Sequence, residues 1–193
     1  IDQLSFKRAI EQRPPILSDY KVVSSVIIRS EIEKIISNNE FIKSDGKRFT
    51  IESDASTLSA LVTLRKITKE KNLKHIVSFH SSIKRAKEFQ GLNNQANNCQ
   101  NDLGFLESFH VTGKDGTGRR AAELDRFIDS EVGLVTNARC LTEGVDVPSI
   151  DTVLFADPKQ SLIDIVQASG RALRKFNGKK FGYIVIPVVI DDT

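Results

Sequence analysis

From Leu73 onward, the sequence alternates short apolar, β-branched runs with segments of helical periodicity. Strands that are joined through helices need crossover connections, and such connections link parallel strands. The runs also lack polar alternation, which is typical of strands that are buried on both faces. The sequence therefore predicts an α/β fold with a mostly parallel sheet flanked by helices on both faces. The expected strands of this part are His75–Phe79, a stretch within Leu103–Thr112, Val132–Thr136, Ile150–Ala156 and Gly182–Val189.

The segment before Leu73 is less regular. Tyr20–Ile28 predicts a further strand, whereas Glu31–Ser37 and Ser56–Lys71 predict helices with a turn around Ser44–Arg48 between them. We expect residues 1–28 to form an initial segment with the first strand, 29–57 a helical insertion or appendage, and 58–193 the main domain. Further helices are expected over roughly Ile83–Gln90, Arg119–Ser130 and the region of Val166–Arg174, and a mobile loop over Asn93–Asn101.

Composition narrows the class of protein. A chain of 193 residues with 39% hydrophobic and 27% charged residues can bury one substantial core. Cys99 and Cys140 lack the spacing of a zinc site or a disulfide framework, so no metal site is expected. No apolar run approaches the roughly 18 residues of a membrane span, and no signal-peptide pattern is present. These features favour a cytoplasmic protein, and the absence of Met favours a fragment of a longer product.

The charge pattern favours an anionic partner. The net charge is +3, and the basic residues gather in four clusters. Any one cluster is explained by a solvated helix face, but several clusters near predicted strand ends suggest a track for phosphates. The clusters are Arg65, Lys66, Lys69, Lys71 and Lys74; Lys84, Arg85 and Lys87; Lys114, Arg119 and Arg120; and Arg171, Arg174, Lys175, Lys179 and Lys180.

One predicted helix carries a polar stripe. Gln167, Gly170, Arg171 and Arg174 recur at i, i+3, i+4 and i+7, which places two guanidinium groups and an amide on one helical face. We expect this face to point outward, because the opposite face is mostly apolar. Scattered arginines on a surface helix are the alternative. A glycine within a helix costs about 1 kcal/mol relative to Ala, so Gly170 suggests close approach of a ligand or backbone. The apolar face comprises Leu162, Ile165, Val166, Ser169, Ala172 and Leu173.

Polar residues follow several predicted strands. The carboxyl ends of parallel strands lie at one edge of a sheet, where helix N-termini offer free N–H groups to anions. Hydroxyl, amide and backbone groups in such loops can contact phosphates, although Ser and Thr are also ordinary helix caps. The candidates for such contacts are Ser81, Thr112, Gly113, Thr136 and Asn137.

Two loop motifs are candidate nucleotide sites. Gly113–Arg120 approaches the P-loop pattern, but Arg119 replaces its Lys and Arg120 replaces the hydroxyl that holds Mg²⁺. A glycine-rich turn is therefore expected, and the chain should be unable to bind and hydrolyse a nucleoside triphosphate alone. In the second motif, Gly144 permits close backbone approach, and the Asp146 carboxylate can accept from a ribose hydroxyl or an arginine. The alternative is that Glu143 and Asp146 are simply turn residues.

Together these segments resemble the second RecA-like domain of superfamily 2 helicases and translocases. HIVSFHSSIKRAKEF is similar to the fourth helicase motif, TNARCLTEGVDVPSIDTVLFADP to the fifth and QASGRALR to the sixth. The sequences TEGVDVP and GRALRK, followed by GKKFGYIVIPV, resemble those of DEAD/DEAH-like helicases of the restriction-modification and phage-defence type. Residues 58–193 would then be the RecA-like helicase C-terminal domain.

The resemblance implies a motor in which ATP and Mg²⁺ are bound mainly by a first RecA-like domain of the same polypeptide. Arg171 and Arg174 would be arginine fingers at the γ-phosphate, and Gln167 would organise the same phosphate. The sixth motif departs from many relatives at Ala168, which leaves two fingers. Gly144, Asp146 and Gly170 would lie beside the nucleotide, and Ser81, Thr112, Gly113, Thr136 and Asn137 would contact the nucleic-acid backbone.

The resemblance to helicases of the restriction-modification type implies DNA rather than RNA as the nucleic acid. It also implies nuclease or methylase domains as further partners. One alternative is a degenerate, helicase-like module that binds nucleic acid or a partner without assisting hydrolysis. Another is a stand-alone NTPase that uses Gly113–Arg120.

Overall fold

The fold is built on one sheet of six parallel strands in the order β1-β6-β5-β2-β4-β3. The computed structural model describes residues 6–38, 41–43, 45–99, 104–137, 147, 149–157 and 162–190. Every pair of neighbouring strands is parallel, as predicted. The strands are β1 (Asp19–Ile28), β2 (His75–Phe79), β3 (Glu107–Val111), β4 (Gly133–Asn137), β5 (Thr152–Phe155) and β6 (Phe181–Ile190).

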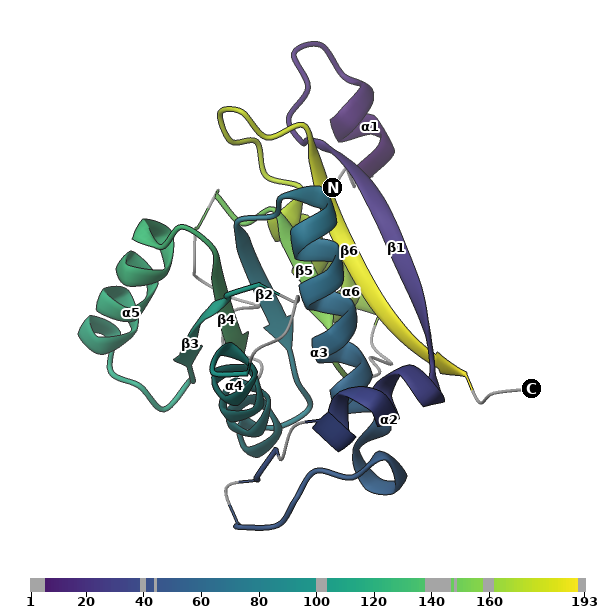
Figure 1. Ribbon diagram of the computed structural model, residues 1–193. Coiled ribbons are helices and arrows are strands. Elements are labelled where there is room, and N and C mark those ends of the chain that lie inside the picture. The colour runs from purple at the N-terminus through teal and green to yellow at the C-terminus, as the bar shows by residue number, and fades with distance from the viewer. Residues whose placement is uncertain are drawn as a thin grey trace.

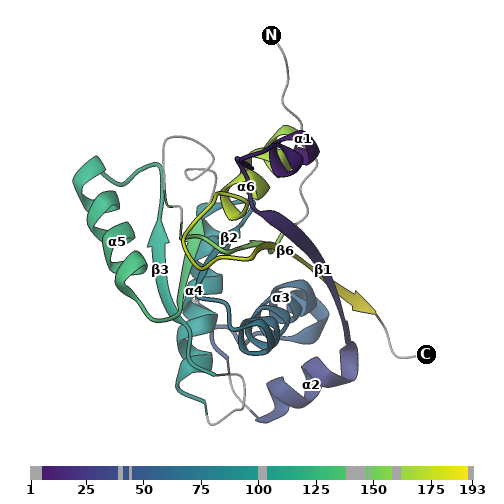
Figure 2. The same ribbon diagram turned by 90° about the horizontal axis from the view of Figure 1, so that it is seen from above.

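Helices cover both faces of this sheet (Figure 1). The view from above shows α3 on one side of the sheet and α6 on the other (Figure 2). The predicted α/β class is thereby confirmed. The helices are α1 (Phe6–Glu11), α2 (Arg29–Asn38), α3 (Ile51–Lys71), α4 (Ile83–Asn97), α5 (Thr117–Asp129) and α6 (Leu162–Ala172).

The strands divide the interior into two apolar cores. Successive strand residues point to opposite faces, so Ile76 lies in one core and Val77 in the other. The first core joins the sheet to α2, α3 and α4, with Leu58 and Phe89 fully buried. The second core joins it to α5 and α6 through Phe127 and Ala168. Burial on both faces is the physical reason why the strand sequences lack polar alternation.

The segment expected to be an insertion shares the first core. Ile32 of α2, Phe41 and Phe49 are buried in the same cluster as Leu58 of α3 and Val185 of β6. The helix predicted from Ser56 begins instead at Ile51, so the predicted boundary after residue 57 falls inside α3. A tight turn lies where it was expected, and the Lys43 N–H donates to the Lys47 carbonyl at 2.7 Å.

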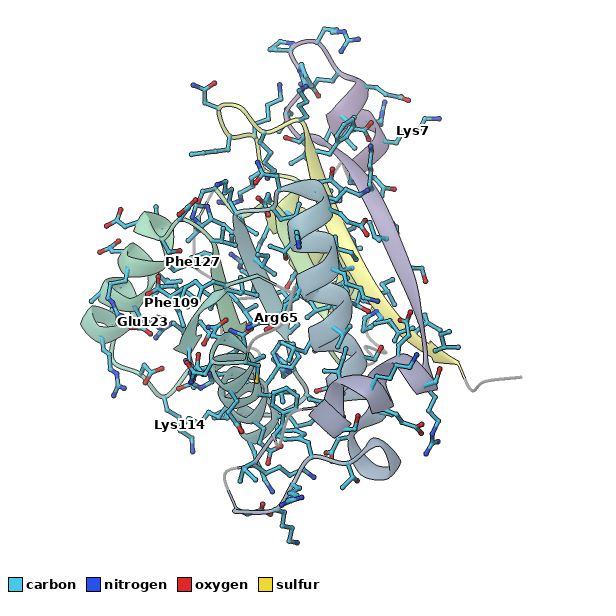
Figure 3. All side chains as sticks on the ribbon, viewed as in Figure 1. Lys7, Arg65, Phe109, Lys114, Glu123 and Phe127 are labelled. Atoms are coloured by element: carbon cyan, nitrogen blue, oxygen red, sulfur yellow. The ribbon has the colours of Figure 1, made fainter. Side chains whose placement is uncertain are left out.

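The mobile loop expected over Asn93–Asn101 is wrong for its first part, because α4 continues to Asn97. Arg65 of α3 is 1% exposed and makes hydrogen bonds to the side chain of Asn93 and to the Gly104 carbonyl. Asn97 also accepts from this guanidinium, and both asparagines donate to the Leu106 carbonyl. The Asn-rich sequence therefore forms the polar side of a helix that accepts hydrogen bonds from the buried guanidinium of Arg65, which Figure 3 labels.

By sequence, Arg65 belongs to the basic residues that suggest a track for phosphates. Because Arg65 is buried, it cannot contribute to such a track. Burial lowers the pKa of Arg65 to about 10, with a smaller opposing effect from Cys99. Among the described residues, its hydrogen-bond acceptors are neutral oxygens: two asparagine side chains, the Asn93 carbonyl and the Gly104 carbonyl. The guanidinium thus ties α3, α4 and the segment before β3 together.

We expect Arg65→Met to lower the free energy of unfolding by roughly 2–4 kcal/mol, because it leaves several buried acceptors without a donor. Urea denaturation of the 193-residue chain measures this change. Arg119→Met, which removes an exposed arginine of α5, is the matched control and should change stability by less than about 0.5 kcal/mol. Equal losses in the two variants would contradict a structural role for the Arg65 network.

Candidate nucleotide and nucleic-acid sites

The candidate residues fall at two opposite edges of the sheet. Ser81, Thr112 and Gly113 directly follow the ends of β2 and β3, so they lie at the edge formed by the carboxyl ends of the strands. Helix α6 runs from the end of β5 back toward the start of β6, antiparallel to the strands. Arg174 therefore lies at the edge where the strands begin, and it pairs there with Leu17. The structure separates the predicted nucleic-acid contacts from the predicted arginine fingers.

Ser81 is joined to a carboxylate that follows the neighbouring strand. Asp157 accepts from the Ser81 N–H at 2.8 Å and from the Ser81 hydroxyl at 2.9 Å. Arg85 of α4 donates to the same carboxylate through Nε at 2.7 Å. Burial raises the pKa of Asp157, but the hydrogen bonds from Arg85 and Ser81 outweigh it, and the net shift is downward. The Ser81 hydroxyl is thus already a donor, and a phosphate there would compete with Asp157.

The sequence predicted a glycine-rich turn over Gly113–Arg120; a turn follows Thr112 at Gly113–Asp115, and α5 already begins at Thr117. The Asp115 carboxylate accepts from the Thr112 N–H at 2.7 Å and from the Thr112 hydroxyl at 3.0 Å. These hydrogen bonds from Thr112 lower the pKa of Asp115 below its ordinary value. A carboxylate therefore occupies the N–H and O–H donors that a phosphate-binding loop would present. This arrangement argues against a P-loop at Gly113–Arg120.

Thr136 and Asn137 are fully buried at the end of β4. The Thr136 hydroxyl donates to the Phe109 carbonyl at 3.3 Å and lies 2.8 Å from His110 Nδ1. As placed, both side chains are buried at the end of an internal strand, so a phosphate contact from either would require it to become exposed. The role of Thr136 and Asn137 in nucleic-acid binding stays a prediction.

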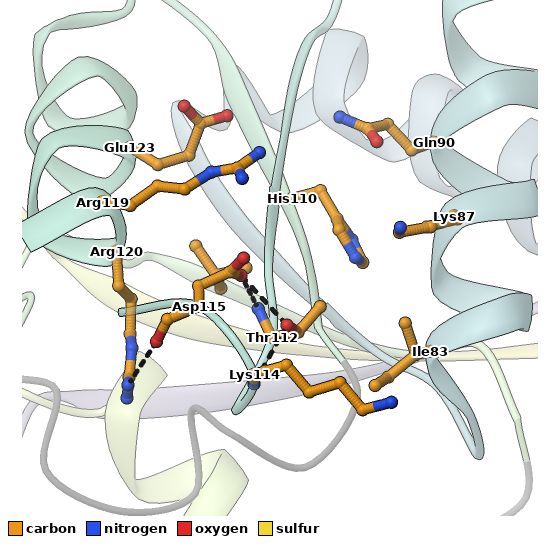
Figure 4. A pocket seen from close by; sticks show the side chains of 11 residues that line it. Ile83, Lys87, Gln90, His110, Thr112, Lys114, Asp115, Arg119, Arg120 and Glu123 are labelled. Carbon is orange, nitrogen blue, oxygen red and sulfur yellow. Dashed lines mark hydrogen bonds between the residues drawn. The ribbon is translucent and has the colours of Figure 1, made fainter. Parts of the chain in front are cut away.

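A basic cavity lies beside the Thr112 turn (Figure 4). Its volume is about 510 Å³, and α4, β3 and α5 line it. Two of the four basic clusters meet here, because Lys87 comes from α4 while Lys114 and Arg119 follow β3. The lining comprises Ile83, Lys87, Gln90, His110, Val111, Thr112, Lys114, Asp115, Arg119, Arg120 and Glu123, with four Lys or Arg side chains against two carboxylates.

The sequence identified both basic clusters that line the cavity, but it did not predict that they lie next to each other. Lys87 and Arg119 lie on helices of opposite faces of the sheet, and they approach each other only because β3 is the edge strand. His110 lies between them, and burial lowers its pKa, with Lys87 acting in the same direction. Gln90 and His110 were absent from the predicted site, because a single polar residue within a strand or helix gives no sequence signal of its position.

The polar stripe of α6 is not the outward face that the periodicity predicted. Arg171 is only 8% exposed, and burial lowers the pKa of its guanidinium. Val166, predicted to be buried, is 42% exposed, and Gln167 is exposed beside it. The buried face is centred on Ala168 and Ala172, which are both 0% exposed over the second core. The helix is therefore rotated relative to the prediction, with small residues rather than large ones against the sheet.

Arg174 lies outside the helix, which ends at Ala172, so the predicted i+7 continuation of the stripe is wrong. The Leu173 carbonyl accepts from the Ser18 N–H at 2.7 Å, and Arg174 pairs with Leu17 in an antiparallel bridge. These contacts to the segment before β1 replace the next helical turn. Gly182 of β6 allows the end of α6 to pack closely against β6, since a Cβ at Gly182 would lie 2.2 Å from the Ala172 carbonyl oxygen.

The remaining predicted nucleotide contacts are only partly described. Gly170 is half-buried on α6, whereas Gly144 and Asp146 lie outside the described residues. Among the residues that the structure describes, no three His, Cys, Asp or Glu side chains come together as a metal site. None of the described helices is long and apolar enough to span a membrane.

His80 is a buried residue at the same edge as Ser81, and it was not among the predicted site residues. It is 2% exposed, and its Nε2 lies 2.9 Å from the Ser78 hydroxyl. Its ring centroid lies 4.9 Å from that of Phe89. Burial lowers the pKa of His80 to about 4, although Asp157 acts in the opposite direction. His80 is therefore neutral at physiological pH and forms part of the apolar support beneath the strand ends.

Comparison with known proteins identifies the class of this fold and site. Residues 56–176 match the helicase conserved C-terminal domain, so the chain belongs to this family. The ATP-dependent RNA helicase HAS1 of Candida glabrata is 27% identical over 148 residues, which cover 75% of this chain and 28% of HAS1. The chain thus spans less than a third of the length of that relative.

Two solved structures show the same architecture. The ATP-dependent type ISP restriction-modification enzyme LlaBIII bound to DNA matches 97% of this chain and 13% of its own, with 26% identity and a TM-score of 0.71. Domain 2 of the DEAD-box helicase Mss116p bound to an RNA duplex matches 90% of this chain and 54% of its own, with 19% identity and a TM-score of 0.55. The chain is a second, C-terminal RecA-like domain of the superfamily 2 type.

The buried His80 predicts a loss of stability in mild acid. Its folded-state pKa of about 4 lies below the ordinary value of 6.5, so between these pH values the unfolded chain binds a proton that the folded chain does not. Stability should therefore fall as the pH drops from about 6.5 to 4, by up to roughly 3 kcal/mol. Urea denaturation of the chain at a series of pH values measures this slope. His80→Gln should flatten it, whereas an unchanged slope would contradict the assignment.

Proposed function

We propose that the chain is the second motor domain of an ATP-dependent nucleic-acid helicase or translocase. Its family membership supports this role, together with the separation of a basic cavity at one edge of the sheet from Arg171 and Arg174 toward the other. In this proposal, a first RecA-like domain of the same polypeptide binds ATP. The observation that carries the proposal is the match to the helicase C-terminal domain over the segment that contains both arginines.

ATP and Mg²⁺ are assigned mainly to that first domain. The Thr112–Asp115 turn presents a carboxylate where a phosphate cradle needs free N–H groups, and no acidic metal-binding group occurs among the described side chains. The described part of the chain instead offers cationic side chains, which fit the outer side of a triphosphate. Bound ATP supplies the phosphoryl transfer that drives the motor, and we propose that Gln167 contacts the same phosphates.

The arginines of this chain would stabilise the charge that develops on the γ-phosphate. Such fingers contribute about 10³–10⁵ in rate. Arg171 suits this role because its guanidinium is largely removed from water. Electrostatic interactions are stronger in an environment from which water is excluded. Arg174 suits it because its backbone is fixed between α6 and the segment before β1. Both groups would then be held in place before ATP closes the two domains.

In the intact protein, Arg171→Ala and Arg174→Ala should each lower the kcat of nucleic-acid-stimulated ATP hydrolysis by about 10³. The affinity for nucleic acid in the absence of nucleotide should change little, because both arginines lie away from the basic cavity. Steady-state ATPase assays and binding titrations measure the two quantities. Arg126→Ala on the exposed side of α5 is the matched control. Unchanged turnover in both finger variants would favour the degenerate binding module.

We further propose that the basic cavity and the Thr112 turn contact the nucleic-acid backbone. Phosphate contacts need cations and donors rather than particular bases, and Lys87, Lys114 and Arg119 supply cations from two helices and a loop. DNA is the proposed substrate, because the chain resembles the DNA-bound LlaBIII over 97% of its length. Nuclease or methylase domains in the same polypeptide follow from the same resemblance to a restriction-modification enzyme.

The double variant Lys87→Ala/Arg119→Ala should weaken DNA binding and should reduce the slope of log K against log salt by about 2, because two phosphate contacts are lost. Fluorescence anisotropy with single-stranded and duplex DNA at several salt concentrations measures both effects, and the same titration with RNA tests the choice of nucleic acid. Lys71→Ala/Lys180→Ala removes two cations at the opposite edge and is the control. An equal effect in both double variants would remove the cavity from the proposed interface.

A further inference from the structure

Lys179 directs its ammonium group at two backbone carbonyls from different parts of the chain. Its Nζ donates to the Ile150 carbonyl at 2.6 Å and to the Arg174 carbonyl at 2.7 Å. Ile150 lies just before β5, and Arg174 lies just after α6. One side chain therefore ties the end of the arginine-bearing segment to the start of a central strand.

The backbone at Arg174 is also held from two other sides. Its N–H donates to the Arg171 carbonyl at 3.2 Å, and the preceding Leu173 carbonyl accepts from Ser18. Leu17 completes the pairing through the antiparallel bridge. With Lys179 on the carbonyl, contacts from α6, from the segment before β1 and from the β6 connection fix the Cα from which the Arg174 side chain extends.

Lys179 differs from its neighbours in the same basic cluster. Lys175 and Lys180 are exposed, whereas Lys179 is half-buried. Burial lowers the pKa of Lys179 to about 8, with Asp151 acting in the opposite direction. A lysine that served only to solubilise this surface would keep its ammonium group in water, as the other two do. The desolvated ammonium instead makes charge-assisted hydrogen bonds, which are stronger than neutral ones.

We propose that Lys179 is a positioning residue for Arg174 in ATP hydrolysis. It acts through the Arg174 backbone and does not touch the nucleotide. This inference rests on the proposed function, because it requires Arg174 to act on bound ATP. An arginine finger must be placed accurately, and a displacement of about 1 Å in such a group can lower the rate by up to about 100-fold.

A double-mutant cycle in the intact protein tests the inference. Lys179→Met should lower the kcat of nucleic-acid-stimulated ATP hydrolysis by roughly tenfold to 100-fold, with the affinity for nucleic acid unchanged. In an Arg174→Ala background, the same substitution should cause no further loss, because its effect passes through Arg174. Lys180→Met removes the same charge from an exposed neighbour and should leave kcat unchanged.

The outcomes separate this inference from the proposed function. Wild-type turnover in Arg174→Ala would overturn the finger role of Arg174, and wild-type turnover in Arg171→Ala as well would overturn the proposed function itself. A slow Arg174→Ala with a normal Lys179→Met would overturn the positioning role alone. Equal losses from Lys179→Met in both backgrounds would show a general structural effect and would also overturn it. If Lys179→Met does not fold, Lys179→Gln, which keeps an N–H donor, enters the same cycle.

Discussion

The parallel direction of all six strands is the constraint on which the rest of the structure depends. It forces every loop that follows a strand to one edge of the sheet and returns each crossover helix to the other. Because α6 is such a crossover, Arg171 near its end and Arg174 just after it lie away from Ser81 and Thr112 at the carboxyl ends. The separation of the two candidate sites is thus a consequence of topology rather than of local sequence.

The fold was predictable because its signal is carried by residues that are close in sequence. Val77, Val135 and Val153 belong to short β-branched runs, and each run forms a buried strand within two residues of its expected bounds. The error at Asn93–Asn101 has the opposite origin. An Asn-rich segment indicates a loop by composition, yet here Asn93 and Asn97 are helical and accept hydrogen bonds from Arg65, which is distant in sequence.

The candidate site was predictable in its residue types but not in its geometry. Helical periodicity placed Arg171 outward, since it counts apolar residues and cannot see that small residues such as Ala168 let a helix approach the sheet closely. Periodicity also extended α6 to Arg174. The helix instead ends at Ala172, and the backbone of Leu173 and Arg174 pairs with Ser18 and Leu17. These are contacts between distant segments, and no local pattern records them.

The two edges of the sheet suggest how one domain can serve two ligands at once. Thr136 and Asn137 end β4 at the edge of the proposed nucleic-acid contacts, while Ile150, just before β5, accepts from Lys179 beside Arg174. The β2 strand between these points is buried and paired on both sides, which favours a stiff link between the two edges. In the proposed motor, a displacement at the nucleic-acid edge would carry the arginines at the other edge with it. Coupling between ATP and nucleic acid would then come from contacts of both ligands with a second domain, without rearrangement within this one.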